Sequence, residues 1–180
     1  MLIQREQSLL LVVDIQEKLA PAIFAGDEAV RNNVRLLTGA GQLGIPSFVS
    51  EQYVRGLGAS LAAIRNATVD AHFFEKIHFS CTREPGVVEK LKTTGRQQII
   101  LTGMESHVCV LQTGLGLLES GFAVFLVADA TSSRTSANRQ AAIERLRAAG
   151  GKIVTTEMVL FEWLEKAGTA EFKALLPLIK

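Results

Sequence analysis

The sequence has little of several features that mark specialised classes of protein. Lysine and arginine number 19 against 18 aspartates and glutamates, so the formal net charge is only +1. Neither half carries a long run of one sign, which argues against a nucleic-acid-binding face. The apolar runs, such as residues 9–13, end far short of the ~20 residues that span a bilayer. We therefore expect no nucleic-acid partner and no insertion into a membrane.

Cysteine is also scarce, because the chain has only Cys81 and Cys109. Two cysteines in an apparently intracellular chain are more often free thiols than a disulfide. The first residues lack a basic segment, and the apolar stretch that follows ends in Asp14 instead of a small-residue cleavage site. We expect a cytoplasmic protein whose folding needs neither a disulfide nor a metal.

The composition is that of an ordinary folded domain, with 48% hydrophobic and 21% charged residues. No Gly/Ser-rich or Pro-rich linker, repeat or low-complexity tract interrupts the chain. We therefore expect a single domain over residues 1–180.

Short apolar runs alternate with longer stretches of helical periodicity, a pattern typical of strand–helix units around a parallel sheet. Parallel neighbours need crossover helices, which pack on both faces of the sheet. This pattern predicts an α/β fold with three layers (α/β/α), doubly wound around a mainly parallel six-stranded sheet. The predicted strands are residues 8–14, 46–50, 71–74, 97–102, 122–128 and 152–155.

Capping residues and glycines bound the predicted helices. Asp27 is the expected N-cap of a helix that ends near Gly44, and Thr156 and Thr169 are expected to cap two C-terminal helices. Three further helices are predicted between these limits, over residues 85–95, 106–120 and 136–149.

Three chemically versatile residues stand where predicted strands end and helices begin. Ligands of open α/β sheets collect beyond the carboxyl ends of the strands, so Asp14, Lys76 and Cys109 share one expected crevice. A thiol near a helix N-terminus is expected to favour the thiolate. Taken singly, each has a plain alternative: Asp14 as a helix cap, Lys76 as a surface lysine and Cys109 as a small buried apolar residue.

Other patterns point to no cofactor. His107 stands two residues before Cys109, and residues two apart on a helix lie on opposite sides, so we expect no Cys–His dyad. The remaining histidines and Cys81 lack the spacing of a zinc site, and Cys81 is assigned to packing. Glycines 114 and 116 lie inside a predicted helix, not at a dinucleotide-binding turn.

Several segments together resemble a known family, the isochorismatase-like cysteine hydrolases, which include nicotinamidases and carbamoylsarcosine amidases. The resemblance spans almost the whole chain, and its branch of isochorismatase-domain-containing proteins is the most similar. The segments are Leu11-Val12-Val13-Asp14-Ile15-Gln16, Glu51-Gln52-Tyr53 with Gly56-Leu57-Gly58, Phe74-Glu75-Lys76, Gly103-Met104-Glu105-Ser106-His107-Val108-Cys109-Val110 and Asp129-Ala130-Thr131-Ser132-Ser133-Arg134.

The resemblance implies a set of roles for individual residues. It implies a catalytic triad of Asp14, Lys76 and Cys109, and a cis peptide bond between Met104 and Glu105. It also implies that the backbone N–H groups of Glu105 and Cys109 form the oxyanion hole. In that chemistry Asp14 takes the thiol proton, the sulfur attacks a carbonyl-type carbon, and a thioester forms.

The same resemblance guides expectations about ligands and assembly. The family's metal-binding nicotinamidases have an Asp-x-His pair where this chain has Glu51-Gln52-Tyr53, so neither a catalytic metal nor nicotinamide is expected. The family forms dimers and larger assemblies, which implies a homo-oligomer. The residues expected to line the pocket for a small-molecule substrate are Gln16, Phe24, Gln52, Tyr53 and Leu57.

The sequence thus favours a metal-independent cysteine hydrolase of a small amide-like (C–N) substrate. Two alternatives remain open at this point. One is isochorismate-type vinyl-ether hydrolysis with Asp14 as the acid. The other is a binding or scaffold protein that keeps the fold without turnover.

Overall fold

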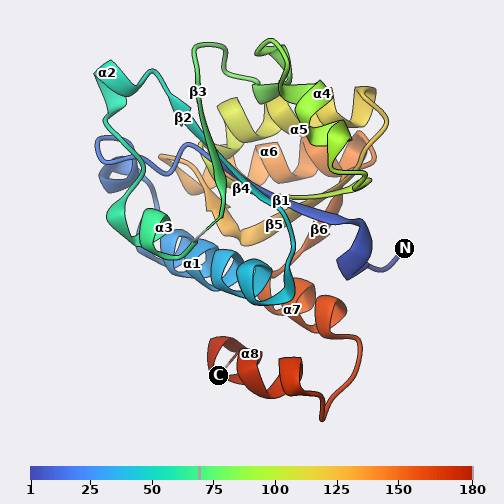
Figure 1. Cartoon of the computed structure of the whole chain (residues 1–180). Coiled ribbons are helices and arrows are strands. Elements are labelled where there is room, and N and C mark those ends of the chain that lie inside the picture. Colours follow the sequence, from blue (N-terminus) through green and yellow to red (C-terminus); the bar gives the residue numbers. More distant parts are fainter. Residues whose placement is uncertain (69, 180) are drawn as a thin grey trace.

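Six parallel strands form the central layer of the fold (Figure 1). The computed structural model describes residues 1–68 and 70–179; Val69 and Lys180, which the single-domain prediction includes, lie outside them. The sheet order is β3-β2-β1-β4-β5-β6 and every strand pairing is parallel, which confirms the predicted fold class. The strands are β1 Ser8–Val13, β2 Ser47–Gln52, β3 His72–Lys76, β4 Gln98–Met104, β5 Ala123–Ser132 and β6 Lys152–Val154.

Helices cover both faces of this sheet, and the central strands are apolar on both sides for that reason. Along β1, Leu10 and Val12 pack toward α1, α7 and α8, while Leu9, Leu11 and Val13 pack toward α4, α5 and α6. The helices are α1 Gly26–Leu43, α2 Val54–Leu57, α3 Ala62–Asn66, α4 Val87–Thr93, α5 Leu111–Glu119, α6 Ser136–Ala148, α7 Thr156–Leu164 and α8 Ala170–Ile179. Short 3-10 turns occupy Arg5–Gln7, Ala20–Ala22 and Cys81–Arg83, and a π-helical segment, Ser106–Val110, leads into α5.

Three of the predicted helix starts are wrong by one or two residues. The helix α4 begins at Val87 after Gly86, so Pro85 precedes the helix instead of lying in its first turn. The helix α1 begins at Gly26 after Ala25, which has a left-handed backbone (φ 49°), so Asp27 lies in the first turn instead of at the N-cap. An acid there still interacts favourably with the helix dipole. The N-cap of α7 is Thr155, whose hydroxyl accepts a hydrogen bond from the Met158 N–H, so Thr156 is the first helical residue.

The cap predicted at Thr169 is confirmed, because its hydroxyl accepts a hydrogen bond from the Phe172 N–H at 3.0 Å. It starts α8, whose Leu175 packs into the core beside α1. Within the described part of the chain, no helix has both the length and the apolar character needed to cross a membrane.

The strand order creates a switch point between β1 and β4. The chain leaves β1 for α1 on one face and leaves β4 for α5 on the other, so a crevice opens between their carboxyl ends. Gly103 allows the two strands to approach there: a Cβ on this residue, whose φ is 110°, would lie 2.0 Å from the Val13 carbonyl oxygen. Only glycine fits this position without moving a strand.

Candidate functional site

A buried ion pair lies at the switch point. Asp14 follows β1 directly and Lys76 ends β3, and the Lys76 Nζ lies 2.8 Å from the Asp14 Oδ2 with both side chains fully buried. Asp14 has a left-handed backbone (φ 51°), which Asp tolerates better than most residues. Such a backbone at a strand end turns the chain sharply, and it is a recurrent feature of functional sites.

Each oxygen of the Asp14 carboxylate has its own partner. Besides the Lys76 contact at Oδ2, Oδ1 accepts a hydrogen bond from the Ser50 hydroxyl at 2.7 Å. Ser50 is fully buried in β2, next to β1 in the sheet. Both contacts stabilise the ionised carboxylate and fix its orientation.

The Lys76 ammonium is held from several sides. It donates to the Gln52 side-chain oxygen and to the carbonyl oxygens of His78 (3.2 Å) and Phe79 (3.0 Å). Burial opposes its charge, but Asp14 raises the pKa of Lys76 above its ordinary value, so this lysine is cationic at neutral pH. Its role is therefore that of a fixed counter-charge and not of a proton donor.

Cys109 lies in the π-helical segment that follows β4, and only 7% of the residue is exposed. Burial and the neighbouring Asp14 carboxylate raise the pKa of the Cys109 thiol, and Lys76 offsets them only in part. This differs from the expectation that a helix N-terminus favours the thiolate here. The site thus places a protonated thiol beside the Asp14 carboxylate, an arrangement suited to proton transfer when a substrate arrives.

Cys81, which the sequence suggested was a packing residue, lies in the same buried cluster as Cys109. Its backbone N–H donates to the Thr113 hydroxyl at 3.0 Å, and Thr113 is on α5, one turn beyond Cys109. Burial and Asp14 raise the pKa of Cys81 to about 11. Cys81 is fully buried, whereas Cys109 keeps a small exposed fraction, so a reagent has better access to Cys109.

The segment between β4 and Cys109 has the geometry that the resemblance implies. The Met104–Glu105 peptide bond is cis. The Glu105 carbonyl oxygen accepts hydrogen bonds from the N–H groups of Val108 and Val110. The Glu105 carboxylate pairs with the Arg134 Nε at 2.8 Å, which joins the ends of β4 and β5.

The structure gives Gln16 a different role from the predicted one in a substrate pocket. Its side chain is buried and its amide is fully engaged: Oε1 accepts from the Gln52 N–H, and Nε2 donates to the carbonyl oxygens of Gln52 and Gly58. Gln16 therefore fixes the backbone between β2 and α2. The Gln52 side-chain oxygen accepts a hydrogen bond from Lys76, and its Nε2 donates to the Ile77 carbonyl oxygen. Gln52 therefore helps to orient the Lys76 ammonium.

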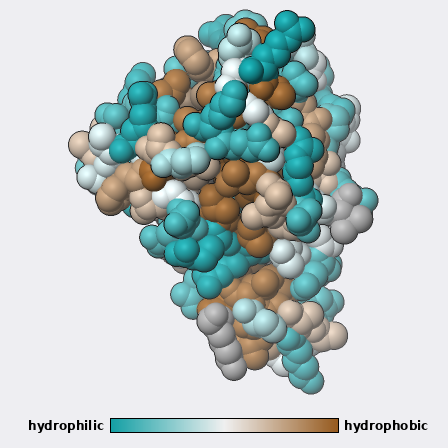
Figure 2. All heavy atoms as spheres, turned by 90° about the vertical axis from the view of Figure 1, so that its left-hand side faces the viewer, coloured by the Kyte–Doolittle hydropathy of each residue, from teal (hydrophilic) through white to brown (hydrophobic). Residues whose placement is uncertain are grey.

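The other predicted pocket residues lie at the outer edge of the site. Phe24 and Tyr53 are 48% and 54% exposed, and Leu57 is half-buried. The Phe24 N–H donates to the Ser133 carbonyl oxygen, and the Phe24 carbonyl oxygen accepts a hydrogen bond from the Ser132 hydroxyl at the end of β5. Figure 2 views the molecule from the side on which α2 and α3 lie, and apolar side chains gather there among polar ones.

Sequence reasoning missed two residues that contact the site. Ser50 gave a weak signal, because its hydroxyl follows the apolar residues Phe48 and Val49 at the end of the predicted strand 46–50. Arg134 belongs to a segment that carried the family resemblance, but nothing local indicated that its partner is Glu105. Long-range pairs of this kind depend on the topology and not on spacing.

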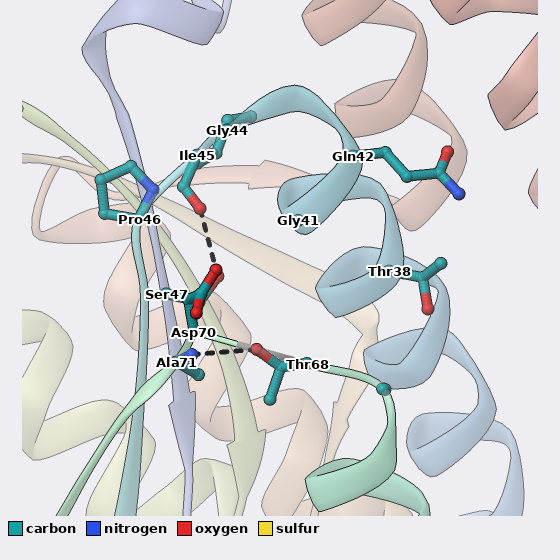
Figure 3. A pocket seen from close by; sticks show the side chains of 11 residues that line it. Thr38, Gly41, Gln42, Gly44, Ile45, Pro46, Ser47, Thr68, Asp70 and Ala71 are labelled. Carbon is teal, nitrogen blue, oxygen red and sulfur yellow. Dashed lines mark hydrogen bonds between the residues drawn. The ribbon is translucent and has the colours of Figure 1, made fainter.

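A large cavity lies in a different part of the molecule from the candidate site. A cavity of about 570 Å³ lies at the opposite, amino-terminal edge of the strands, between the end of α1 and the start of β2 (Figure 3). We name it the amino-edge cavity; its lining includes Thr38, Gly41, Ser47, Thr68 and Asp70. Among residues 1–68 and 70–179, no group of three or more His, Cys, Asp or Glu side chains is arranged to hold a metal ion.

Fold and site together define an α/β/α protein with a buried acid–lysine pair and a thiol at its switch point. The model of the family described as "Isochorismatase domain" matches residues 8–158. Isochorismatase domain-containing protein 2 of Danio rerio is 39% identical over 96% of this chain and 86% of its own. The chain belongs to the isochorismatase family, whose hydrolase fold it has.

Solved structures of other proteins are also similar to this chain. A structure titled MAR1 ribonuclease from Caenorhabditis elegans is 36% identical, with a TM-score of 0.94, and the match covers 99% of this chain and 92% of that one. YcaC from Pseudomonas aeruginosa, described with covalent acrylamide, is 26% identical with a TM-score of 0.91 over 98% and 91% of the chains. YcaC from Escherichia coli, described as an octameric hydrolase of unknown specificity, shares the fold at 23% identity, a TM-score of 0.92 and 99% and 90% coverage.

Proposed function

We propose that this protein is a metal-independent cysteine hydrolase that cleaves a C–N bond in a small amide-like substrate. The observation that carries the proposal is the buried Asp14–Lys76 pair, 2.8 Å apart, beside the protonated thiol of Cys109. A base held ionised by a fixed cation next to a thiol is the arrangement that nucleophilic catalysis needs. The covalent acrylamide in the related YcaC structure supports the nucleophile in that proposal, because acrylamide becomes covalent when a nucleophile such as a thiol adds to its C=C bond.

The reaction follows from these groups. Asp14 accepts the proton of Cys109 as the sulfur attacks the carbonyl carbon, and the oxygen becomes an oxyanion held by the N–H groups of Glu105 and Cys109. One such donor can lower the barrier by ~3 kcal/mol. Asp14 returns the proton to the leaving nitrogen, the C–N bond breaks, and a thioester remains.

Water completes the cycle. Asp14, ionised again, takes a proton from water as the oxygen attacks the thioester carbon. The C–S bond breaks, the acid product leaves, and the Cys109 sulfur regains its proton. Lys76 stays charged throughout and keeps Asp14 oriented.

Thiol reactivity tests the proposal directly. Iodoacetamide should alkylate Cys109 faster than Cys81, and Asp14→Asn should slow alkylation of Cys109 because no base remains to accept the proton. The rates are measured by peptide mass spectrometry. Equal rates for both cysteines would sink the proposal, and turnover that survives Cys109→Ala would favour vinyl-ether hydrolysis by Asp14.

We also propose that the protein acts as a homo-oligomer. Four of its exposed large apolar side chains, Phe24, Tyr53, Ile77 and Phe79, lie in loops at the carboxyl edge of the sheet, where contact with another copy would bury them. The octameric relative supports this proposal. Light scattering at micromolar concentration tests it, and a monomer would contradict it.

The name MAR1 ribonuclease, which a similar structure carries, raises RNA cleavage as another candidate function, and the site argues against it. RNA binding relies on many exposed cations that contact the phosphates, whereas Lys76 is buried beside Asp14 and the net charge is only +1, so the site favours a small substrate over RNA. Incubation with a labelled RNA checks this reading, and cleavage lost in Cys109→Ala would overturn it.

A further inference from the structure

An exposed cation stands beside the candidate site. Arg134 follows β5, and its Nε donates to the Glu105 Oε1 at 2.8 Å. The Glu105 side chain is 12% exposed and that of Arg134 is 61% exposed, so the pair spans from the wall of the site to solvent. Glu105 is also the residue whose backbone N–H belongs to the proposed oxyanion hole.

The contacts around this pair tie it closely to Cys109. The Val110 N–H donates to the Glu105 carbonyl oxygen, and the His107 N–H donates to the Ser133 hydroxyl at 3.3 Å. Residues 133 and 134 therefore pack on the segment that carries the thiol. Arg134 sits at the mouth of the site and not on a distant surface.

The terminal nitrogens of the Arg134 guanidinium can donate hydrogen bonds to a ligand. A guanidinium carries five N–H donors, and Glu105 uses only the one at Nε. No described residue accepts a hydrogen bond from its two terminal nitrogens. Their parallel N–H groups match the two oxygens of a carboxylate. Because Glu105 already fixes the guanidinium, a ligand would lose less side-chain entropy on binding it.

Other cations near this edge do not offer the same geometry. Lys76 is buried and its ammonium is surrounded by four acceptors. Arg55 on α2 is exposed, but the structure shows no acidic partner that orients it. Arg65 on α3 is also oriented, by Glu51 at 2.6 Å, but it stacks over the Phe73 ring at β3. Arg134 differs because its segment is hydrogen-bonded to the segment that carries the thiol.

We propose that Arg134 determines specificity by binding a carboxylate of the substrate, so that the enzyme acts on small amides that also carry a carboxylate. This assignment rests on the proposed thiol chemistry, and it names the substrate class of the same site. Glu105 acts as a positioning residue, since it orients Arg134 and does not touch the ligand.

Two alkylating reagents of nearly equal size separate the roles. In both, the Cys109 sulfur forms a bond to the CH2 carbon, iodide leaves, and Asp14 takes the thiol proton; iodoacetate carries a carboxylate where iodoacetamide carries a neutral amide. Arg134→Gln should slow alkylation of Cys109 by iodoacetate about 10-fold while iodoacetamide changes less than about twofold. Arg55→Gln, the matched control at the same edge, should leave the ratio of the two rates within about twofold.

The outcomes are distinct. An equal loss with both reagents would show that Arg134 merely holds the fold of the Glu105 segment, and an unchanged ratio would show that it binds no carboxylate; either result overturns the assignment. If Arg134→Gln does not fold, Arg134→Lys serves instead, because it keeps the charge but loses the paired donors. Failure of the thiol chemistry itself is recognised separately, by iodoacetamide alkylation of Cys109 that does not depend on Asp14.

Turnover gives a second readout. Succinamate and butyramide are primary amides of the same chain length, and only succinamate carries a carboxylate. Arg134→Gln should raise KM for succinamate about 10-fold with kcat little changed, and it should leave butyramide hydrolysis unaffected. A fall in kcat for both amides would instead assign Arg134 to the fold of the oxyanion hole.

Discussion

The two edges of the sheet differ in what they provide. The amino-edge cavity offers about 570 Å³ of space, but Asp70 is the one ionisable residue in its lining. The carboxyl edge buries an acid paired with a lysine, and a thiol beside the acid. Electrostatic interactions strengthen as water is excluded, so the closed edge holds the reactive groups. The size of a cavity is therefore a poor guide to chemistry in this fold.

The largest expected difference between the edges is in turnover. Cys109→Ala should lower kcat by about 10³-fold or more, because no nucleophile remains. Asp70→Asn, the matched change at the amino edge, should leave kcat/KM within about twofold. Steady-state kinetics on a primary amide measures both. A comparable loss in the two variants would mean that the amino-edge cavity takes part in function.

The second largest expected difference between the two edges is in the free energy of unfolding. Lys76→Met leaves the Asp14 charge buried without its partner, so the free energy of unfolding should fall by about 3–5 kcal/mol. Lys90→Met removes an exposed lysine from α4 and should cost less than about 0.5 kcal/mol. Urea denaturation followed by circular dichroism measures both values. A cost below about 1 kcal/mol for Lys76→Met would show that the pair is hydrated in solution.

Alkaline pH should weaken the carboxyl edge selectively. The pKa of Cys81 is about 11 in the folded state against 9.0 for an unperturbed thiol. Between these values the unfolded chain releases a proton that the folded chain keeps, so stability is complete below about pH 9 and is lost as pH rises toward 11. The slope is about 1.4 kcal/mol per pH unit.

Urea titrations from pH 8 to pH 10 measure this decline. The matched variant Cys81→Ala should show a shallower slope, whatever its stability at pH 8. The raised pKa of Cys109 contributes in the same direction, so some decline should remain. An identical slope in both proteins would contradict the assignment to Cys81.

The smallest expected effect lies at the amino edge. Gly41 lies within α1, and a Cβ there would meet no atom within 4 Å. Gly41→Ala should stabilise the fold by about 0.5–1 kcal/mol through helix propensity and leave turnover unchanged. Thermal unfolding and the amide assay check the two parts. A loss of turnover would connect the amino edge to the site.

The three-layer arrangement could be predicted from the sequence, for a clear physical reason. Strands buried on both faces are continuous apolar runs, so β1 and β4 are visible as Leu-, Ile- and Val-rich segments. The predicted helix starts were less accurate. The positions of the N-caps, Ala25 and Thr155, depend on local backbone geometry, which the amino-acid types only suggest.

Contacts between distant segments account for most of what the sequence could not predict at the site. Strand-end position grouped Asp14, Lys76 and Cys109, which the structure brings together. It could not show that Gln16 turns inward to bind the backbone of Gln52. The rise in the pKa of Cys109 was missed for the same reason, because it depends on burial and on Asp14 and not on the helix end.

The absent side chain of Gly103 has a consequence for any redesign of this protein. It allows β4 to lie against Val13, the residue just before Asp14, and it also precedes the cis bond that leads to the thiol. The spacing between Asp14 and Cys109 is thus set by a backbone contact and not by adjustable side chains. Substitutions that reshape the ligand pocket can therefore be made in the surrounding loops, but Gly103 must be retained in every variant.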